Sequence, residues 1–171
     1  MPISPFCSIL CLVRKKVYRR LKILVFSDSH GDVASMDRTI LREKPDHILH
    51  LGDCVRDAKA LEKHGIPLTC VAGNCDWGSD EPTVLTPVFR STKIYMTHGH
   101  LHRVKMQYQL IFYAGLEAEA DIILFGHTHQ AECFTKEGVW LMNPGACGGR
   151  GTYGVITLEK GGPECCIKSV Q

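Results

Sequence analysis

Residues 21–28 read LKILVFSD, and this stretch decides the fold. The run is almost wholly apolar, which predicts a strand that is buried on both faces of a sheet. Asp28 follows the run directly and therefore stands at the carboxyl end of the strand. Apolar residues at helical spacing come next, from Val33 to Glu43, and Pro45 closes that segment.

Two further strands of the same kind also end in polar residues. Residues 47–51 lead to Gly52-Asp53, and residues 67–72 lead to Gly73-Asn74. Strands that alternate with helices at this spacing form right-handed crossovers and run parallel. Parallel strands share one carboxyl edge, where open α/β sheets place their ligands. We therefore expect Asp28, Asp53 and Asn74 to meet along that edge.

The second half of the chain repeats the pattern and then changes it. A strand over 93–97 ends at His98, and another over 122–125 delivers Gly126 and His127. The remaining expected elements are helices over 57–64 and 104–120, a strand over 84–89, and two antiparallel hairpins over 131–142 and 153–169.

Composition excludes several classes of protein. The chain has 171 residues, enough for one domain with its own core. With 44% hydrophobic and 22% charged residues it fits neither a disordered nor a membrane-spanning protein. The net charge of +2 argues against broad electrostatic capture of nucleic acid, so we expect no stable nucleic-acid complex.

The cysteines and the N-terminus carry two further predictions. The nine cysteines contain no Cys-x-x-Cys pair, which favours reduced core residues of a cytoplasmic protein over a disulfide framework. The first twenty residues do not match the rest, because five cations follow a short apolar run. We expect residues 1–20 to be a disordered or non-native extension and residues 21–171 to be the domain, with no membrane association.

Five polar motifs lie at the ends of the expected strands. They are Asp28-Ser29-His30, Gly52-Asp53, Gly73-Asn74-Cys75-Asp76, His98-Gly99-His100 and Gly126-His127-Thr128-His129. Carboxylate, amide and imidazole groups are the donors that Mn²⁺, Fe²⁺, Zn²⁺ and Ni²⁺ accept. Together the motifs predict a two-metal site.

In order and strand context, these motifs and Asn143-Pro144-Gly145 resemble the calcineurin-like metallophosphoesterase superfamily, in particular its small single-domain phosphodiesterase branch. The resemblance covers about residues 21 to 158. It implies an α/β fold, a four-layer α/β/β/α sandwich of two mixed sheets, with two metal ions at the top of the sheets.

The resemblance also implies the ligands. It places Asp28, His30 and His129 on one ion and Asn74, His98 and His127 on the other, with Asp53 bridging the two. Of these, Asp53, Asn74 and His98 are the residues to which we assign a direct catalytic part. One carboxylate can bridge two ions about 3.5 to 4 Å apart, as in other two-metal hydrolases. We expect two divalent ions, Mn²⁺ first, with Ni²⁺, Fe²⁺ and Zn²⁺ also suited.

Four other residues are candidates for proton transfer, ligand orientation or substrate contact. Cys75 stands where many relatives carry a histidine, and a thiol is a poor proton donor to an alkoxide. Asp76 would orient neighbouring groups, or would be a solvated turn residue. His100 and Arg150 would contact phosphate, or would be ordinary loop residues. A fifth residue, Trp77, would wall a substrate pocket or pack in the ordinary way, and ordinary packing is the favoured interpretation.

The inferred activity is hydrolysis of small phosphodiesters by in-line attack of metal-bridging hydroxide. A phosphomonoesterase is the alternative within the enzyme class. A metal-binding protein-interaction scaffold is the alternative outside it, because a retromer subunit uses this fold mainly in that way. The expected partner is a small phosphorylated substrate, and the formation of a homodimer is left open.

Overall fold

The computed structural model describes residues 19–170. The expectation for residues 1–20 therefore lies outside the described residues, except at Arg19 and Arg20. Arg19 pairs with Asp46 at 2.9 Å, and Arg20 donates a hydrogen bond to Thr157 at 3.2 Å.

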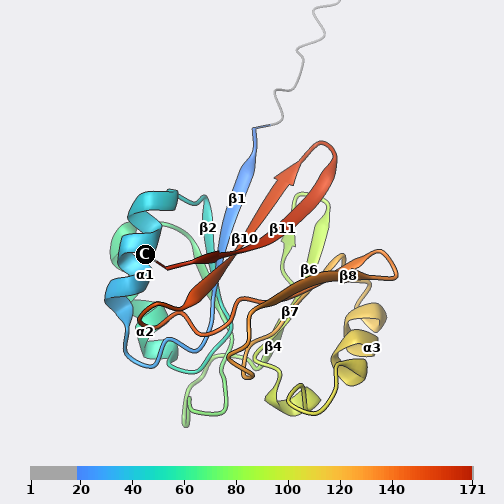
Figure 1. Cartoon of the computed structure of the whole chain (residues 1–171), viewed down its shortest axis with the longest axis horizontal. Coiled ribbons are helices and arrows are strands. Elements are labelled where there is room, and N and C mark those ends of the chain that lie inside the picture. The colour runs from blue at the N-terminus through green and yellow to red at the C-terminus, as the bar shows by residue number, and fades with distance from the viewer. Residues whose placement is uncertain (1–18, 171) are drawn as a thin grey trace, which may run out of the picture.

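The strands form two mixed sheets that pack face to face (Figure 1). The first has the order β11-β10-β1-β2-β3, with β1 parallel to β2 and β2 parallel to β3. Its strands are β1 (Leu21–Phe26), β2 (His47–His50), β3 (Leu68–Cys70), β10 (Thr152–Glu159) and β11 (Gly162–Ser169).

The second sheet has the order β4-β6-β7-β9-β8, with β5 pairing to β6. Strands β6, β7 and β9 are parallel, and β4, β5 and β8 join antiparallel. Its strands are β4 (Val84–Leu85), β5 (Val88–Phe89), β6 (Thr92–Thr97), β7 (Ile122–Leu124), β8 (Glu132–Lys136) and β9 (Val139–Asn143).

Helices cover the outer faces of the two sheets. Figure 1 shows α1 and α2 on the side of the first sheet and α3 on the side of the second. The helices are α1 (Val33–Glu43), α2 (Val55–Lys59) and α3 (Gln109–Glu117), with short 3₁₀ segments η1 (Ala60–His64) and η2 (His100–His102). No helix within residues 19–170 is long and apolar enough to cross a membrane.

Strand β1 shows why the sandwich forms. Ile23 and Val25 face the core between the sheets, whereas Leu24 and Phe26 face the core under α1. All four are fully buried, as the apolar run predicted. A third apolar cluster joins α3 to the second sheet. Three apolar layers between four structural layers confirm the predicted α/β/β/α architecture.

Two expected elements are wrong in their extent. The helix expected over 104–120 is limited to Gln109–Glu117, because Tyr108 before it has a φ of −101° and a ψ of 0°, and Glu119 after it has a positive φ of 53°. Both interrupt helical geometry. The strand expected over 84–89 is two short strands, β4 and β5, with Pro87 between them. Proline has no N–H to donate to a ladder.

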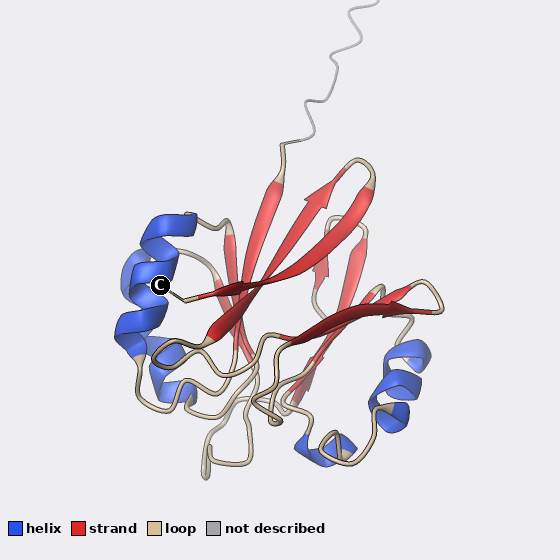
Figure 2. Cartoon of the chain, in the orientation of Figure 1, coloured by secondary structure: helices blue, strands red, loops and turns tan. Residues whose placement is uncertain are grey.

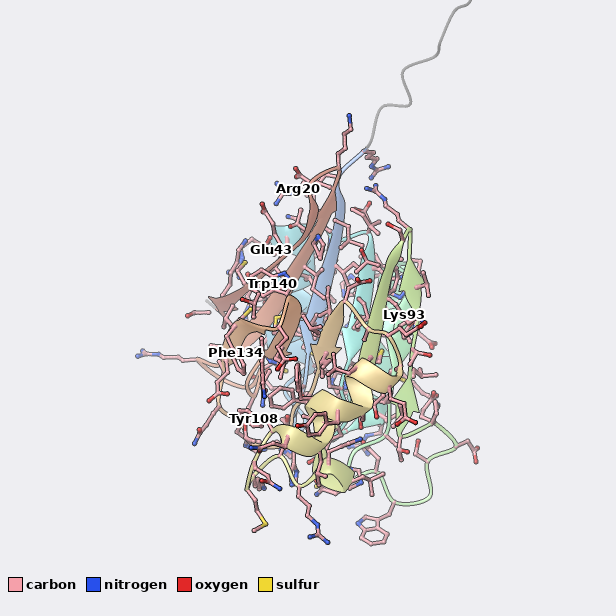
Figure 3. All side chains as sticks on the ribbon, turned by 90° about the vertical axis from the view of Figure 1, so that its right-hand side faces the viewer. Arg20, Glu43, Lys93, Tyr108, Phe134 and Trp140 are labelled. Atoms are coloured by element: carbon pink, nitrogen blue, oxygen red, sulfur yellow. The ribbon has the colours of Figure 1, made fainter. Side chains whose placement is uncertain are left out.

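The side of the molecule that carries α3 presents apolar groups to solvent. Figure 3 looks onto α3, with Tyr108 and Phe134 close together on that side, their ring centroids 6.4 Å apart. Along α3 itself, Leu110, Tyr113 and Leu116 are exposed. The helix is therefore apolar on both its faces.

Candidate metal centre

Polar residues from both sheets meet where the parallel strands end. Asp28, Asp53 and Asn74 follow β1, β2 and β3, whose parallel pairing places them along one edge, as predicted. His98 and His127 follow β6 and β7, which are parallel neighbours in the second sheet. Figure 2 shows the loops after these strands gathering at the lower end of the two sheets.

The first group of ligand atoms comes from Asp28, His30 and His129, all within 4.8 Å of one another. His129 Nε2 lies 3.1 Å from Asp28 Oδ1 and 3.5 Å from His30 Nε2. The carboxylate is buried, but the two imidazoles are exposed, the His129 side chain by 49%. This group therefore opens to solvent.

The second group comes from Asp53, His98 and His127, again within 4.8 Å. His98 Nε2 lies 3.4 Å from Asp53 Oδ2 and 3.2 Å from His127 Nδ1. Asn74 joins this group, because its Oδ1 lies 3.2 Å from His98 Nε2. His98 is fully buried. The two groups adjoin, since His98 Nε2 is 4.0 Å from Asp28 Oδ1.

One oxygen of Asp28 tests whether the cluster fits a cation. Its Oδ2 accepts hydrogen bonds from Ser27 Oγ at 2.5 Å and from the His127 backbone N–H at 3.1 Å. Its Oδ1 is buried with no hydrogen bond and faces the ligand atoms of both groups. A buried carboxylate oxygen without a hydrogen bond is costly. A divalent cation would satisfy it, and the oxygen and imidazole donors suit first-row ions.

His98 is held in the orientation that a metal ligand needs. Its Nδ1 lies 2.9 Å from the Leu51 carbonyl oxygen, so this nitrogen carries the proton and donates it. With a cation bound, its Nε2 would then direct a lone pair into the cluster. Backbone carbonyls commonly fix the tautomer and ring orientation of ligating histidines in this way.

The backbone is strained at most of the predicted ligands. Five of them adopt positive φ angles, between 44° and 66°, a region that residues other than glycine rarely enter: Asp28, His30, Asp53, His127 and His129. Each such residue costs of the order of 1–3 kcal/mol, and clusters of them occur at functional sites.

Two motif glycines allow the close approach of the ligand loops. A Cβ atom at Gly126 would collide with Ser27 Oγ and crowd Asp28 Oδ2, across the seam between the sheets. A Cβ atom at Gly73 would collide with the Asp53 carboxylate. Any larger residue at either position would push the ligands apart.

Charge is concentrated around the second group. Burial would raise the pKa of Asp53, but hydrogen bonds from His98 and the Cys75 N–H hold it well below its usual range. Burial would lower the pKa of His98, but its hydrogen bond to Asp53 and the charges of Asp28 and Asp53 raise it. The negative charge that attracts a proton to His98 would equally attract a dication.

Cys75 and Asp76 lie directly beside this group. The Cys75 N–H donates to Asp53 Oδ1 at 2.9 Å, and a thiol hydrogen bond to Asp53, together with burial, raises the pKa of Cys75 to about 11. Asp76 accepts three backbone hydrogen bonds, from Cys54, Val55 and Gly73, at 2.7–2.9 Å. It therefore ties the Gly-Asp turn to the Gly-Asn turn.

The two candidate phosphate contacts, His100 and Arg150, have different surroundings. The His100 ring centroid is 5.5 Å from that of His98, and its Nδ1 is buried without a hydrogen bond. Arg150 is exposed on the glycine-rich loop. That loop is fixed beside the first group, because the Gly149 N–H donates to Asp32 Oδ2 at 2.6 Å.

Sequence reasoning missed Asp57 as a residue that shapes the site. Its Oδ2 accepts hydrogen bonds from Ser29 Oγ at 2.8 Å and from the Gly31 N–H at 2.7 Å, on either side of His30. In the sequence it is one acidic residue at the start of a helical segment, which gives no sign of this contact.

Comparisons with known proteins show the family of this chain. Residues 21–161 match the family described as calcineurin-like phosphoesterase superfamily domain. The chain is 34% identical over 148 residues to the probable metallophosphoesterase YsnB of Bacillus subtilis, covering 81% of this chain and 85% of YsnB. It is 26% identical over 163 residues to phosphodiesterase MJ0936 of Methanocaldococcus jannaschii, covering 82% and 95%.

Two solved structures share the fold. A predicted phosphoesterase from Streptococcus pneumoniae has a TM-score of 0.70 and 27% identity, covering 88% of this chain and 99% of that one. Vacuolar protein sorting 29 of Cryptosporidium parvum also has a TM-score of 0.70, but at 16% identity, covering 88% and 97%, so it shows the fold alone. The chain therefore belongs to the calcineurin-like phosphoesterase superfamily.

Proposed function

We propose that this protein is a two-metal phosphodiesterase that hydrolyses small phosphodiesters, with residues 21–171 as its catalytic domain. One observation carries the proposal. Two adjoining sets of oxygen and nitrogen donors surround a buried carboxylate oxygen that has no hydrogen bond. Proteins rarely leave such an atom unsatisfied unless a ligand completes its environment.

Each predicted ligand has a defined part in the proposal. Asp28, His30 and His129 would hold one ion, Asn74, His98 and His127 would hold the other, and Asp53 would be shared between them. Bound divalent ions would polarise phosphoryl oxygens and lower the pKa of a water molecule. Asp76 and Asp57 position the ligand loops. His100, whose ring centroid lies 5.5 Å from that of His98, would contact a phosphate oxygen. Arg150 would reach the phosphate from the glycine-rich loop.

Preference for diesters draws support from the similarity to phosphodiesterase MJ0936, and Mn²⁺ is the proposed ion. A cytoplasmic location stays a prediction from cysteine usage. The solvent-open first group suits a small substrate.

The weak acidity of the Cys75 thiol affects which leaving groups the protein can accept. A thiol with a pKa of about 11 is a weaker acid at neutral pH than the imidazole that it replaces. We therefore expect the protein to favour diesters with good leaving groups. The variant Cys75→His should gain activity on diesters of aliphatic alcohols, and an unchanged ratio between poor and good leaving groups would contradict this.

The direct test restores single metal ions to the chelated protein. Activity should return with Mn²⁺ or Ni²⁺, with bis-p-nitrophenyl phosphate preferred over p-nitrophenyl phosphate. Elemental analysis should find two ions per chain. Asp53→Ala should abolish turnover, whereas Glu117→Ala, an exposed carboxylate on α3, should retain it.

Two other results would replace the proposal. Preference for the monoester would make the protein a phosphomonoesterase. Stoichiometric metal without turnover on either ester would favour the protein-interaction scaffold, for which the exposed apolar side chains of α3 would supply a contact surface.

A further inference from the structure

A pocket of about 480 Å³ lies beside the candidate metal centre. One wall comes from α2 and its N-cap and includes Cys54, Arg56 and Lys59. The other wall comes from the loop after β3 and includes Cys75, Trp77 and Ser79. Its volume falls within the range of about 300–1,000 Å³ that is usual for small-molecule sites.

Both walls are continuous with the metal ligands. Cys54 follows Asp53 in the chain, and Cys75 follows Asn74. Asp76 accepts hydrogen bonds from the backbone of Cys54 at 2.9 Å, so it fixes the two walls against each other. A molecule in the pocket would therefore lie at a set position relative to a phosphate at the centre.

Trp77 gives the pocket its most unusual property. Its side chain is 93% exposed, although tryptophan is strongly buried on average in folded proteins. The other tryptophan of the chain, Trp140, is partly buried and packs against the core between the sheets. A large rigid ring that projects at the edge of a concave site offers a stacking surface for flat groups, and nucleobases stack on such rings.

The charges in the pocket favour a neutral flat group with an anionic phosphate attached. Lys59 is paired with Glu81 at 3.0 Å, so its charge is compensated. Both carboxylate oxygens of Asp76 accept backbone hydrogen bonds. Arg56 is exposed at the rim, where a guanidinium can stack on an aromatic ring.

We propose that this pocket binds the flat aromatic group of a phosphate ester, a nucleobase above all, while the phosphate lies at the metal centre. The proposal rests on the proposed function and names its substrate class as small nucleotides and related aromatic diesters. Trp77 is the residue that selects them.

A binding experiment tests the pocket without relying on catalysis. In the full chain with Trp140→Phe, Trp77 is the only tryptophan. AMP should quench its fluorescence saturably within seconds of mixing, with an apparent Kd about tenfold lower than that of ribose 5-phosphate measured by competition. Equal affinity for the two, or no quenching by AMP, would overturn the proposal.

A kinetic experiment separates a nucleobase from other aromatic groups. The substrates are the p-nitrophenyl ester of thymidine 5′-monophosphate and methyl p-nitrophenyl phosphate, which share a leaving group. The ratio of their kcat/KM values should exceed about ten and fall about tenfold in Trp77→Ala, mainly through KM. Trp77→Phe should keep most of the preference, and Tyr113→Ala, an exposed aromatic on α3, should keep all of it.

The two experiments distinguish failure of the pocket from failure of the proposed activity. Hydrolysis of both esters with an equal ratio in wild type and Trp77→Ala overturns the nucleobase pocket and leaves the phosphodiesterase standing. Hydrolysis of neither ester, with AMP still quenching Trp77, supports the pocket and removes the enzyme.

Discussion

The two groups of ligands differ in how far the fold encloses them. The group around His98 is fixed by a fully buried imidazole, a carbonyl hydrogen bond and the Cys75 N–H on Asp53. The group around His129 has a buried carboxylate, but its two imidazoles stand on exposed turns. The group around His98, here called the inner group, is preorganised. The group around His129, the outer group, depends on how its loops are held.

This difference implies unequal affinity for the two ions. Ligands that are already in place lose little conformational entropy on binding. The inner group should therefore hold its ion more tightly, and the outer group should exchange its ion with the medium. Variants on the two sides should then respond differently to excess metal.

The largest effect is expected from His98→Ala. Removing the imidazole at the meeting point of both groups should lower kcat/KM on bis-p-nitrophenyl phosphate by about 10³-fold or more, equal to about 4 kcal/mol. Excess Mn²⁺ should not restore it, because no other group can take the buried position. His64→Ala, which removes an imidazole bonded to Asp37, is the control and should stay active. Full recovery of His98→Ala activity with added Mn²⁺ would contradict the proposed difference in affinity between the two groups.

The next effect is expected from His129→Ala. Loss of an exposed ligand should weaken binding of one ion by roughly 100-fold, equal to about 2.7 kcal/mol. A titration with Mn²⁺ should recover most of kcat at saturation. Activity lost as completely as in His98→Ala would mean that the outer imidazole is not an exchangeable ligand.

A smaller effect is expected from Asp57→Asn. The amide keeps one acceptor oxygen, but loses the charge that holds Ser29 and Gly31 around His30. Affinity for the outer ion should fall about tenfold, while kcat at saturating metal stays near the wild-type value. Calorimetric titration measures the two ions separately. Equal weakening of both would show a general loss of structure instead.

The smallest effect on the metal centre is expected from Glu43→Gln, at the end of α1. Burial would raise the pKa of Glu43, but hydrogen bonds from Lys168, Tyr153 and Lys22 lower it to about 2. A depressed pKa stabilises the fold above the unfolded value of 4.5, and this stability is lost as the pH falls towards 2. The variant should lose about 1–3 kcal/mol at neutral pH.

Denaturant unfolding at several pH values checks this prediction. The difference between wild type and Glu43→Gln should shrink below pH 4.5, and metal affinity should be equal in the two proteins. A difference that does not change with pH would mean that the charge of Glu43 contributes nothing to stability.

Much of the fold could be predicted because local pattern and burial agree. The apolar run before Asp28 is a strand buried on both faces, and parallel pairing then fixes where Asp28, Asp53 and Asn74 lie. The positions of motif residues at strand ends can be predicted from the sequence, because they depend on the sheet topology alone.

Other features depend on contacts between distant segments. Asp57 reaches the turn around His30 only because α2 lies against that turn. No residue spacing in the sequence predicts this contact. The helix expected from Val104 is shorter, since Tyr108 and Glu119 leave helical geometry. Ordinary packing was the favoured interpretation for Trp77 and is wrong, because its side chain is 93% exposed.

The position of β1 has a consequence for synthesis of the chain. β1 is made before the other elements of the domain, yet one of its two neighbours is β10, which pairs Leu21 with Leu158. On the ribosome, one edge of this apolar strand therefore stays unpaired until almost the whole domain has emerged. Such an edge invites pairing with other nascent chains. A release of the polypeptide before Thr152 should leave a product that aggregates, so the C-terminal hairpin acts as the closing step of folding.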